Sequence, residues 1–335
     1  MPKRVYIAAT GGTIAMDSGP RGYVPRRGFL QSQMQAMPEL RAPGMPEYVL
    51  REYDPLLDSA NMTPAGWRQI ANDIAANYDA FDGFVVLHGT DTMAYTASAL
   101  AFLLDGLAKP VIVTGSQIPL GEVRNDARLN LITSLQVAGG EPIPEVCVCF
   151  GSRLLRGCRV VKVSADGLEA FDSPNFPALG SCGVEIQVDR KLVRPAGTHL
   201  AVKDLGEPYV AAMRIFPGIR ASVMANIVQP PLQGLVLETY GVGNIPDRDP
   251  DLLAALEEAA GRGVVIVNCT QCLAGSVDMG GYATGSALQR VGVVSGRDMT
   301  AEAALAKLYY LLGLGLSRAE VQAQMQQDLR GELSE

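Results

Sequence analysis

Apolar residues form short unbroken runs of strand length along the chain. Unbroken apolarity is typical of strands that are covered on both faces, as in a parallel sheet, whereas a half-exposed strand alternates. The runs therefore predict a buried and mostly parallel sheet. They lie at residues 5–9, 84–87, 111–113, 146–150, 235–237 and 264–267.

Between these runs, apolar residues recur with helical spacing. Thr63 and Pro64 form a pair that favours a helix start, and Trp67, Ile70 and Ile74 then fall on one face. Strands that alternate with helices predict an α/β fold. Further helices are predicted over residues 93–104, 124–137 and 249–260.

A chain of 335 residues has room for two domains. We predict a larger N-terminal α/β domain over residues 1–190, whose mostly parallel sheet has helices on both faces and which carries the candidate chemistry. A proline-rich segment interrupts the alternation, so a linker is predicted over residues 191–212. A smaller C-terminal α/β domain is predicted over residues 213–335.

Composition and charge exclude several classes of protein. Lys and Arg total 28 and Asp and Glu total 35, so the formal net charge is −7, which argues against a nucleic-acid partner. No apolar run approaches the ~20 residues of a membrane span. The run at residues 5–9 is also too short for a signal peptide. We expect a cytoplasmic protein with no membrane partner.

The cysteines and histidines give little support for metal binding. Cys269 and Cys272 have the spacing of a zinc knuckle, but the two histidines, His88 and His199, lie far from any cysteine pair in the sequence. A structural zinc site needs four ligands. We therefore expect free thiols, no metal site and no cofactor.

Polar residues gather where the predicted strands end. Ligands of open α/β sheets bind beyond the carboxyl ends of the strands. Each polar segment alone has an ordinary structural explanation as a tight turn or a helix cap. Four such segments at successive strand ends predict a site, although they form neither a Walker A motif nor a dinucleotide fingerprint. The segments are residues 10–13, 58–59, 88–91 and 114–117, and the second of them follows a further strand that we expect near residues 48–53.

The sequence shows hydroxyl groups that could act as nucleophiles but no obvious histidine base. His88 directly follows four apolar residues, so we expect a buried and hydrogen-bonded ring. A nucleophilic hydroxyl would then need another base, and a lysine can serve when burial lowers its pKa. Lys162 lies in an apolar stretch and is a candidate. An edge-strand lysine in water is an equally good interpretation at this point.

Two segments carry a specific resemblance to a known family. ATGGTIA at residues 9–15 and LHGTDTM at residues 87–93 resemble the two signature motifs of the L-asparaginase family. The similarity extends over nearly the whole chain and is strongest to the cytoplasmic bacterial type I branch. The resemblance implies a two-domain α/β enzyme that hydrolyses L-asparagine to L-aspartate and ammonia. It also implies a homodimer or homotetramer.

The resemblance also implies roles for individual residues. Thr13 matches the nucleophile on a mobile loop, and Tyr23 matches a tyrosine that approaches it. Thr90, Asp91 and Lys162 match a second catalytic group. The positions matched to substrate binding are Asp58, Ser59, Thr90, Asp91, Ser116 and, from a neighbouring subunit, Asn244.

One position departs from the family pattern. Some type I relatives bind asparagine at a regulatory site that includes an arginine, and Glu238 stands at that position here, although Cys272 is retained. An anion in place of a cation argues against a regulatory site. Two alternatives stay open, namely an amino-acid-binding module without turnover and the glutaminase subunit of a tRNA-dependent amidotransferase. The preference between asparagine and glutamine, and which threonine attacks first, also stay open.

Overall fold

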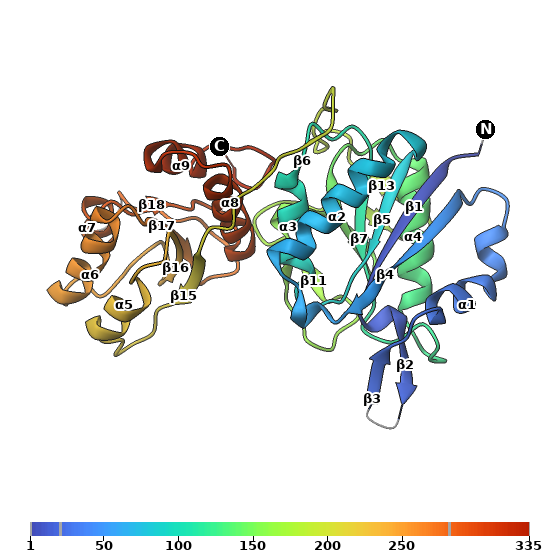
Figure 1. The fold of residues 1–335 in the computed structure, drawn as a ribbon, viewed down its shortest axis with the longest axis horizontal. Helices are drawn as coiled ribbons and strands as arrows, with labels where there is room; N and C mark the ends of the chain where they lie inside the picture. The colour runs from blue at the N-terminus through green and yellow to red at the C-terminus, as the bar shows by residue number, and fades with distance from the viewer. Residues whose placement is uncertain (1, 20–21, 281–282, 335) are drawn as a thin grey trace. The chain divides into compact units, whose positions relative to one another are not determined.

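The chain divides into two units, each with its own sheet (Figure 1). The computed structural model describes residues 2–19, 22–280 and 283–334, without the side chains of residues 283–285. Contacts within the chain divide it into Met1–Val202 and Lys203–Glu335. This division falls inside the segment 191–212, and the exact ends of the predicted linker stay a prediction.

The first unit is built on an eight-stranded sheet of order β13-β12-β9-β8-β7-β5-β1-β4. Its helices include α1 (Phe29–Gln35), α2 (Pro64–Asn77), α3 (Met93–Leu103) and α4 (Ala127–Gly140). Its strands are β1 (Arg4–Gly11), β4 (Glu47–Leu57), β5 (Gly83–Leu87), β7 (Val111–Thr114), β8 (Val146–Phe150), β9 (Arg153–Arg156), β12 (Gly180–Cys182) and β13 (Ile186–Val188). Shorter pairs are β2 (Met16–Gly19) with β3 (Gly22–Pro25), β6 (Leu104–Asp105) with β14 (Ala201–Val202), and β10 (Val161–Lys162) with β11 (Phe171–Asp172).

Five neighbouring strands of this sheet, from β4 to β8, run parallel, and β9, β12 and β13 extend it in antiparallel fashion. The expectation of a mostly parallel sheet is therefore confirmed. Every residue of β5 and β8 is buried. Strands that are apolar on both faces need cover on both sides of the sheet, which is the usual arrangement in parallel sheets.

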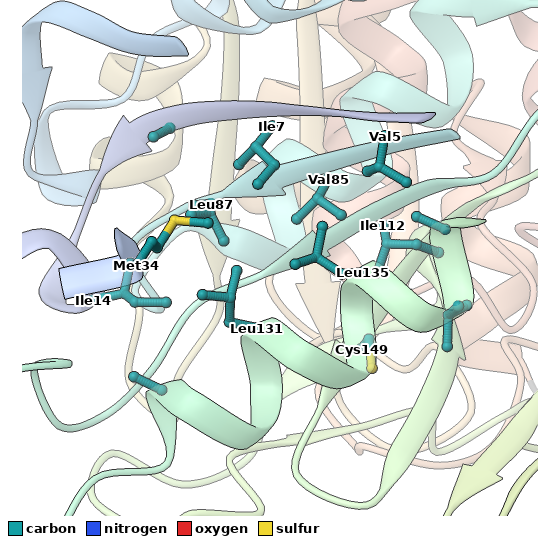
Figure 2. Close-up of a cluster of buried hydrophobic side chains, with 14 of the residues drawn as sticks. Val5, Ile7, Ile14, Met34, Val85, Leu87, Ile112, Leu131, Leu135 and Cys149 are labelled. Atoms are coloured by element: carbon teal, nitrogen blue, oxygen red, sulfur yellow. The ribbon is translucent and has the colours of Figure 1, made fainter. Parts of the chain in front are cut away.

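Successive residues of the central strand β1 point to opposite faces of the sheet. Ile7 packs with Leu131 and Leu135 of α4 in one apolar core (Figure 2). Tyr6, the preceding residue, points to the opposite face, where its hydroxyl donates to Asp73 of α2 at 3.0 Å. Helices thus cover both faces, as the sequence predicts.

The second unit has its own four-stranded parallel sheet of order β15-β16-β17-β18. A separate apolar core lies between this sheet and the helices α5 and α6. The unit is a smaller α/β domain, as predicted. Its elements are β15 (Val210–Arg214), α5 (Ala221–Ile227), β16 (Gly234–Thr239), α6 (Pro250–Gly261), β17 (Val265–Thr270), α7 (Ala283–Arg290), β18 (Val294–Ser295), α8 (Ala301–Gly313) and α9 (Arg318–Met325).

Glycines at the carboxyl ends of the first unit's strands let neighbouring backbones touch. A Cβ atom on Gly12, after β1, would lie 2.3 Å from the nitrogen of Gly89, after β5. A Cβ atom on Gly89 would lie 2.4 Å from the hydroxyl of Ser59, after β4. Gly12 also has φ 79° and ψ 178°, a conformation that essentially only glycine adopts. The segments that follow three strands are therefore packed against one another.

The end of the chain is fixed by a buried ion pair in the second unit. Lys307 of α8 and Glu332 are both 0% exposed, and their Nζ and Oε1 atoms are 2.5 Å apart. Lys307 also donates to the carbonyl of Gln327 at 2.5 Å. Glu332 accepts the backbone N–H groups of Leu329 and Arg330. Each buried charge is compensated only while both partners are present.

We expect Gly12→Ala to lower the free energy of unfolding by roughly 3 kcal/mol or more, because the new Cβ would overlap backbone atoms and the backbone would be strained. Denaturant unfolding measures this. Gly44→Ala is the matched control, because Gly44 has φ 92° with no atom within 4 Å of an added Cβ, and it should cost about 1–2 kcal/mol. Equal losses in the two variants would contradict the close approach.

We expect Glu332→Gln to destabilise the protein by about 3–5 kcal/mol, because the Lys307 ammonium would stay buried without its counter-ion. Glu258→Gln is the control, since Glu258 is 72% exposed in its pair with Arg262 and should contribute less than about 0.5 kcal/mol. Thermal unfolding of both variants distinguishes the two cases. A Glu332→Gln variant as stable as the control would show that the pair does not hold the C-terminus.

Candidate active site

Four strand ends of the first unit meet at the candidate site. Thr13 begins a short 3-10 helix (Thr13–Ala15) directly after Gly12. Asp58 caps another such helix (Ser59–Asn61) after β4, and its carboxylate accepts the N–H of Ala60 at 3.2 Å. The backbone carbonyl of Ser59 accepts the hydroxyl proton of Thr92 at 2.8 Å, which links the ends of β4 and β5.

Thr90, Asp91 and Lys162 come together although they lie far apart in the sequence. The Lys162 Nζ atom lies 2.9 Å from the Thr90 hydroxyl and 2.8 Å from the Asp91 carboxylate. The side chain of Lys162 is 19% exposed, whereas that of Asp91 is 64% exposed. Lys162 is therefore a tethered and largely covered amine, and the interpretation as an edge-strand lysine in open water is wrong.

The contacts of Lys162 define its role in this arrangement. Its amine donates to both partners, and its contact with Asp91 at 2.8 Å is a charge-assisted ion pair. An ammonium group cannot accept a proton. Burial of Lys162 alone therefore does not provide a base, because Asp91 opposes it.

Gln117 is a site residue that the sequence analysis did not single out. The Thr90 hydroxyl donates to its Oε1 atom at 3.1 Å. Its Nε2 atom donates to the carbonyls of Ala165 at 3.0 Å and Gly167 at 3.2 Å, and these two bonds fix which end of the amide faces Thr90. The available signal was its place beside Ser116 at the end of β7.

Tyr23 lies on a hairpin that projects from the body of the first unit (Figure 1). Its side chain is half exposed, and its hydroxyl donates to the Glu122 carboxylate at 2.8 Å. This hydrogen bond raises the pKa of the Tyr23 phenol. Within the described ranges, no hydrogen bond joins Tyr23 to Thr13. This arrangement therefore holds Tyr23 at Glu122.

Two of the remaining expected residues are held by local contacts. The buried Ser116 hydroxyl donates to the carbonyl of Ile118 at 2.7 Å, so it is directed into its own loop. Asn244 belongs to the second unit, where its backbone pairs with Tyr240 in the turn after β16. The expected roles of both residues in substrate binding stay predictions.

Backbone donors are available beside Thr90. Among the residues that the structure describes, the N–H groups of Gly89, Thr90 and Asp91 make no hydrogen bond to another group. Gly89 and Thr90 are nevertheless buried. Buried and unpaired N–H groups are costly, and adjacent ones suit an oxygen atom that gains negative charge during a reaction.

Two searches of the described ranges gave negative results. They contain no group of three or more His, Cys, Asp or Glu side chains placed to hold a metal ion. No helix there is both long enough and apolar enough to span a membrane. The structure describes all six cysteines, and none of them forms a disulfide.

Comparisons with known proteins agree with this geometry. Residues 4–194 match the family model described as Asparaginase, N-terminal, and residues 209–325 match Glutaminase/Asparaginase C-terminal domain. The chain is 51% identical to L-asparaginase 1 of Escherichia coli strain K12 over 336 residues, which cover 99% of this chain and 98% of the relative. It is 44% identical to the 60 kDa lysophospholipase of Mus musculus, over 99% of this chain and 63% of the relative.

A solved structure gives the same result. The crystal structure of L-asparaginase I from Vibrio cholerae has a TM-score of 0.93 to this chain at 50% identity, and the match covers 100% of both chains. The two family models together cover most of the chain, with the N-terminal model before the C-terminal one. The similarity first seen in the two motifs therefore extends over nearly the whole chain. The chain therefore belongs to the asparaginase family.

Proposed function

We propose that this chain is an L-asparaginase that hydrolyses L-asparagine to L-aspartate and ammonia through a threonine ester. The observation that carries the proposal is the contact of Lys162 with Thr90 and Asp91. It lies at strand ends whose backbones are in close contact at Gly12 and Gly89. The close approach of Gly12 and Gly89 supports a second threonine-based group beside the segment that carries Thr13. The names of the relatives with high identity support the same reaction.

In the proposed reaction, the Thr13 hydroxyl oxygen attacks the side-chain carboxamide carbon of asparagine. The hydroxyl proton is transferred to a base, the C–N bond breaks, and the nitrogen leaves as ammonia after it gains a proton. Water then attacks the resulting β-aspartyl ester, which releases aspartate and restores the Thr13 hydroxyl. A threonine hydroxyl is a weak nucleophile at neutral pH, so the base is required.

Substrate binding can convert Lys162 into that base. The α-ammonium group of asparagine, when it binds at Asp91, competes with Lys162 for the carboxylate. Loss of the ion pair at 2.8 Å removes the charge-assisted contact of the ammonium group. The ammonium group then releases one proton to solvent, and the neutral amine accepts the Thr13 proton through the Thr90 hydroxyl, which lies 2.9 Å away.

Tyr23 offers a second route for the same proton. Its hydrogen bond to Glu122 raises the pKa of its phenol, so Tyr23 stays protonated. It can accept the proton of Thr13 only while it passes its own to Glu122. This route requires the β2–β3 hairpin to bring Tyr23 to Thr13, and such a lid movement is common in enzymes that exclude water during catalysis.

The remaining polar groups suit the substrate's own charges. The unpaired N–H groups of Gly89, Thr90 and Asp91 can stabilise the amide oxygen as it gains negative charge, and removal of one such donor costs about 3 kcal/mol. We assign Asp58 with Asp91 to the α-ammonium group and Ser59 to the α-carboxylate. We also propose a cytoplasmic homodimer or homotetramer that needs no cofactor, in which Asn244 of a neighbouring subunit completes the site.

We expect Thr13→Ala and Thr90→Val, made separately, each to reduce ammonia release from asparagine by at least about a thousandfold, because each removes a hydroxyl that the reaction uses. A coupled ammonia assay measures the rate of ammonia release with asparagine and with glutamine. The same assay with an aminoacyl-tRNA substrate would reveal an amidotransferase subunit. Thr133→Val is the matched control, since Thr133 is buried in α4 away from the strand ends. Near-normal turnover in both site variants, with intact folding, would refute the assignment.

The second unit gives a prediction about kinetics. Glu238 pairs with Arg214 of the neighbouring strand, with Nη2 and Oε2 2.9 Å apart. The Arg214 guanidinium is thus already paired with the Glu238 carboxylate of this chain, in the place that the carboxylate of a regulatory ligand would need. We expect the rate to follow simple saturation with asparagine in steady-state assays. A clearly sigmoidal curve would show that a regulatory site is present.

A further inference from the structure

A chain of buried hydrogen bonds lies directly behind the candidate site and has no part in the reaction described above. The Trp67 indole Nε1 donates to the Thr96 hydroxyl at 3.1 Å. The Thr96 hydroxyl lies 2.9 Å from Nε2 of His88, and Nδ1 of His88 lies 2.7 Å from the carbonyl oxygen of Gly89. His88 is completely buried.

The partners of His88 define which ring nitrogen carries the proton. An indole N–H can only donate, so the Thr96 oxygen accepts from Trp67 and its own proton is free to point to His88. A carbonyl oxygen can only accept, so the contact with Gly89 at 2.7 Å requires a proton on Nδ1. The tautomer with the proton on Nδ1 satisfies every group in the chain. The opposite tautomer would place a lone pair against the Gly89 carbonyl.

The carbonyl that His88 holds belongs to the peptide bond between Gly89 and Thr90. Because a peptide unit is planar, a hydrogen bond to its oxygen also fixes the direction of its N–H group. That group is the Thr90 N–H, one of the three backbone donors without a partner among the described residues. A hydrogen bond to the oxygen also polarises the peptide and strengthens its N–H as a donor.

We propose that His88 is a positioning residue: its Nδ1–H group holds the Gly89–Thr90 peptide so that the Thr90 N–H and hydroxyl are pre-organised for the substrate amide. The inference rests on the proposed function, because it concerns the same site. Burial lowers the pKa of the His88 ring to about 4. His88 therefore stays neutral near neutral pH and exchanges no proton with the substrate.

Two substitutions separate the two ring nitrogens. His88→Asn keeps an amide N–H close to the position of Nδ1, so it can still donate to the Gly89 carbonyl. His88→Gln places its amide near the position of Nε2, so it keeps the contact with Thr96 and loses the donor to Gly89. The two variants carry the same functional group and differ mainly in which contact they retain.

We expect His88→Gln to reduce kcat about tenfold or more with KM changed little, a smaller loss than the ~10²–10³-fold of removing a donor outright. We expect His88→Asn to stay within about threefold of the unaltered protein. Thermal unfolding shows whether each variant folds. Unchanged kcat in both variants, equal losses in both, or a larger loss in His88→Asn would overturn the proposal.

A second measurement does not depend on activity. The chain has only two histidines, His88 and His199, so ¹⁵N labelling of histidine gives two rings, and His88→Asn identifies the signals of His88. We expect a protonated Nδ1 and an unprotonated Nε2 that do not change between pH 6 and 8. A proton on Nε2, or titration in that range, would overturn the proposal. If the unaltered protein releases no ammonia, the proposed function fails, while this spectrum still tests the hydrogen-bond chain.

Discussion

The close approach of backbones at the carboxyl ends of the first unit's strands is the constraint on which the site depends. Gly12 and Gly89 leave no room for a side chain between them, and Gly89 is equally close to Ser59. Thr13 and Thr90 each follow one of these glycines directly. Two hydroxyl-bearing residues from distant parts of the sequence are thereby brought to neighbouring positions by backbone contact, before any side-chain interaction is considered. The site is a consequence of how the parallel strands end.

Around this backbone frame, the polar groups are held on both sides of Thr90. Lys162 and Gln117 contact its hydroxyl, and the carbonyls behind Gln117 fix the direction of the amide. His88 holds the peptide that precedes Thr90. Lys162 donates to the Asp91 carboxylate, so the base that we propose would become available only when the substrate's own ammonium group takes that carboxylate. Binding and activation would then be one event.

Much of the fold could be predicted from the sequence because its signals are local. The unbroken apolar runs became buried strands, and Thr63 caps α2 as its position suggested. Helix α4 begins at Ala127 and not at residue 124, because the Asp126 carboxylate accepts the N–H groups of Gln117 and Ile118 in the preceding loop. Strand β9 was missed because the charged Arg156 is buried through partners that lie outside the strand, namely the Glu145 carboxylate and the carbonyl of Leu192. Gln117 lay in a segment predicted to belong to the site but was given no role, since its partners Thr90, Ala165 and Gly167 lie 27 to 50 residues away.

The central claim is that the side chain of one bound amino acid lies between Thr13 and the group formed by Thr90, Asp91 and Lys162. A crystal structure of the protein with L-aspartate, the proposed product, tests it most directly. The account predicts the side-chain carboxylate within hydrogen-bonding distance of the Thr90 N–H and the Thr13 hydroxyl, and the α-ammonium group at Asp91. Aspartate bound away from these strand ends, or a Lys162 amine turned away from Thr90 into solvent, would contradict it.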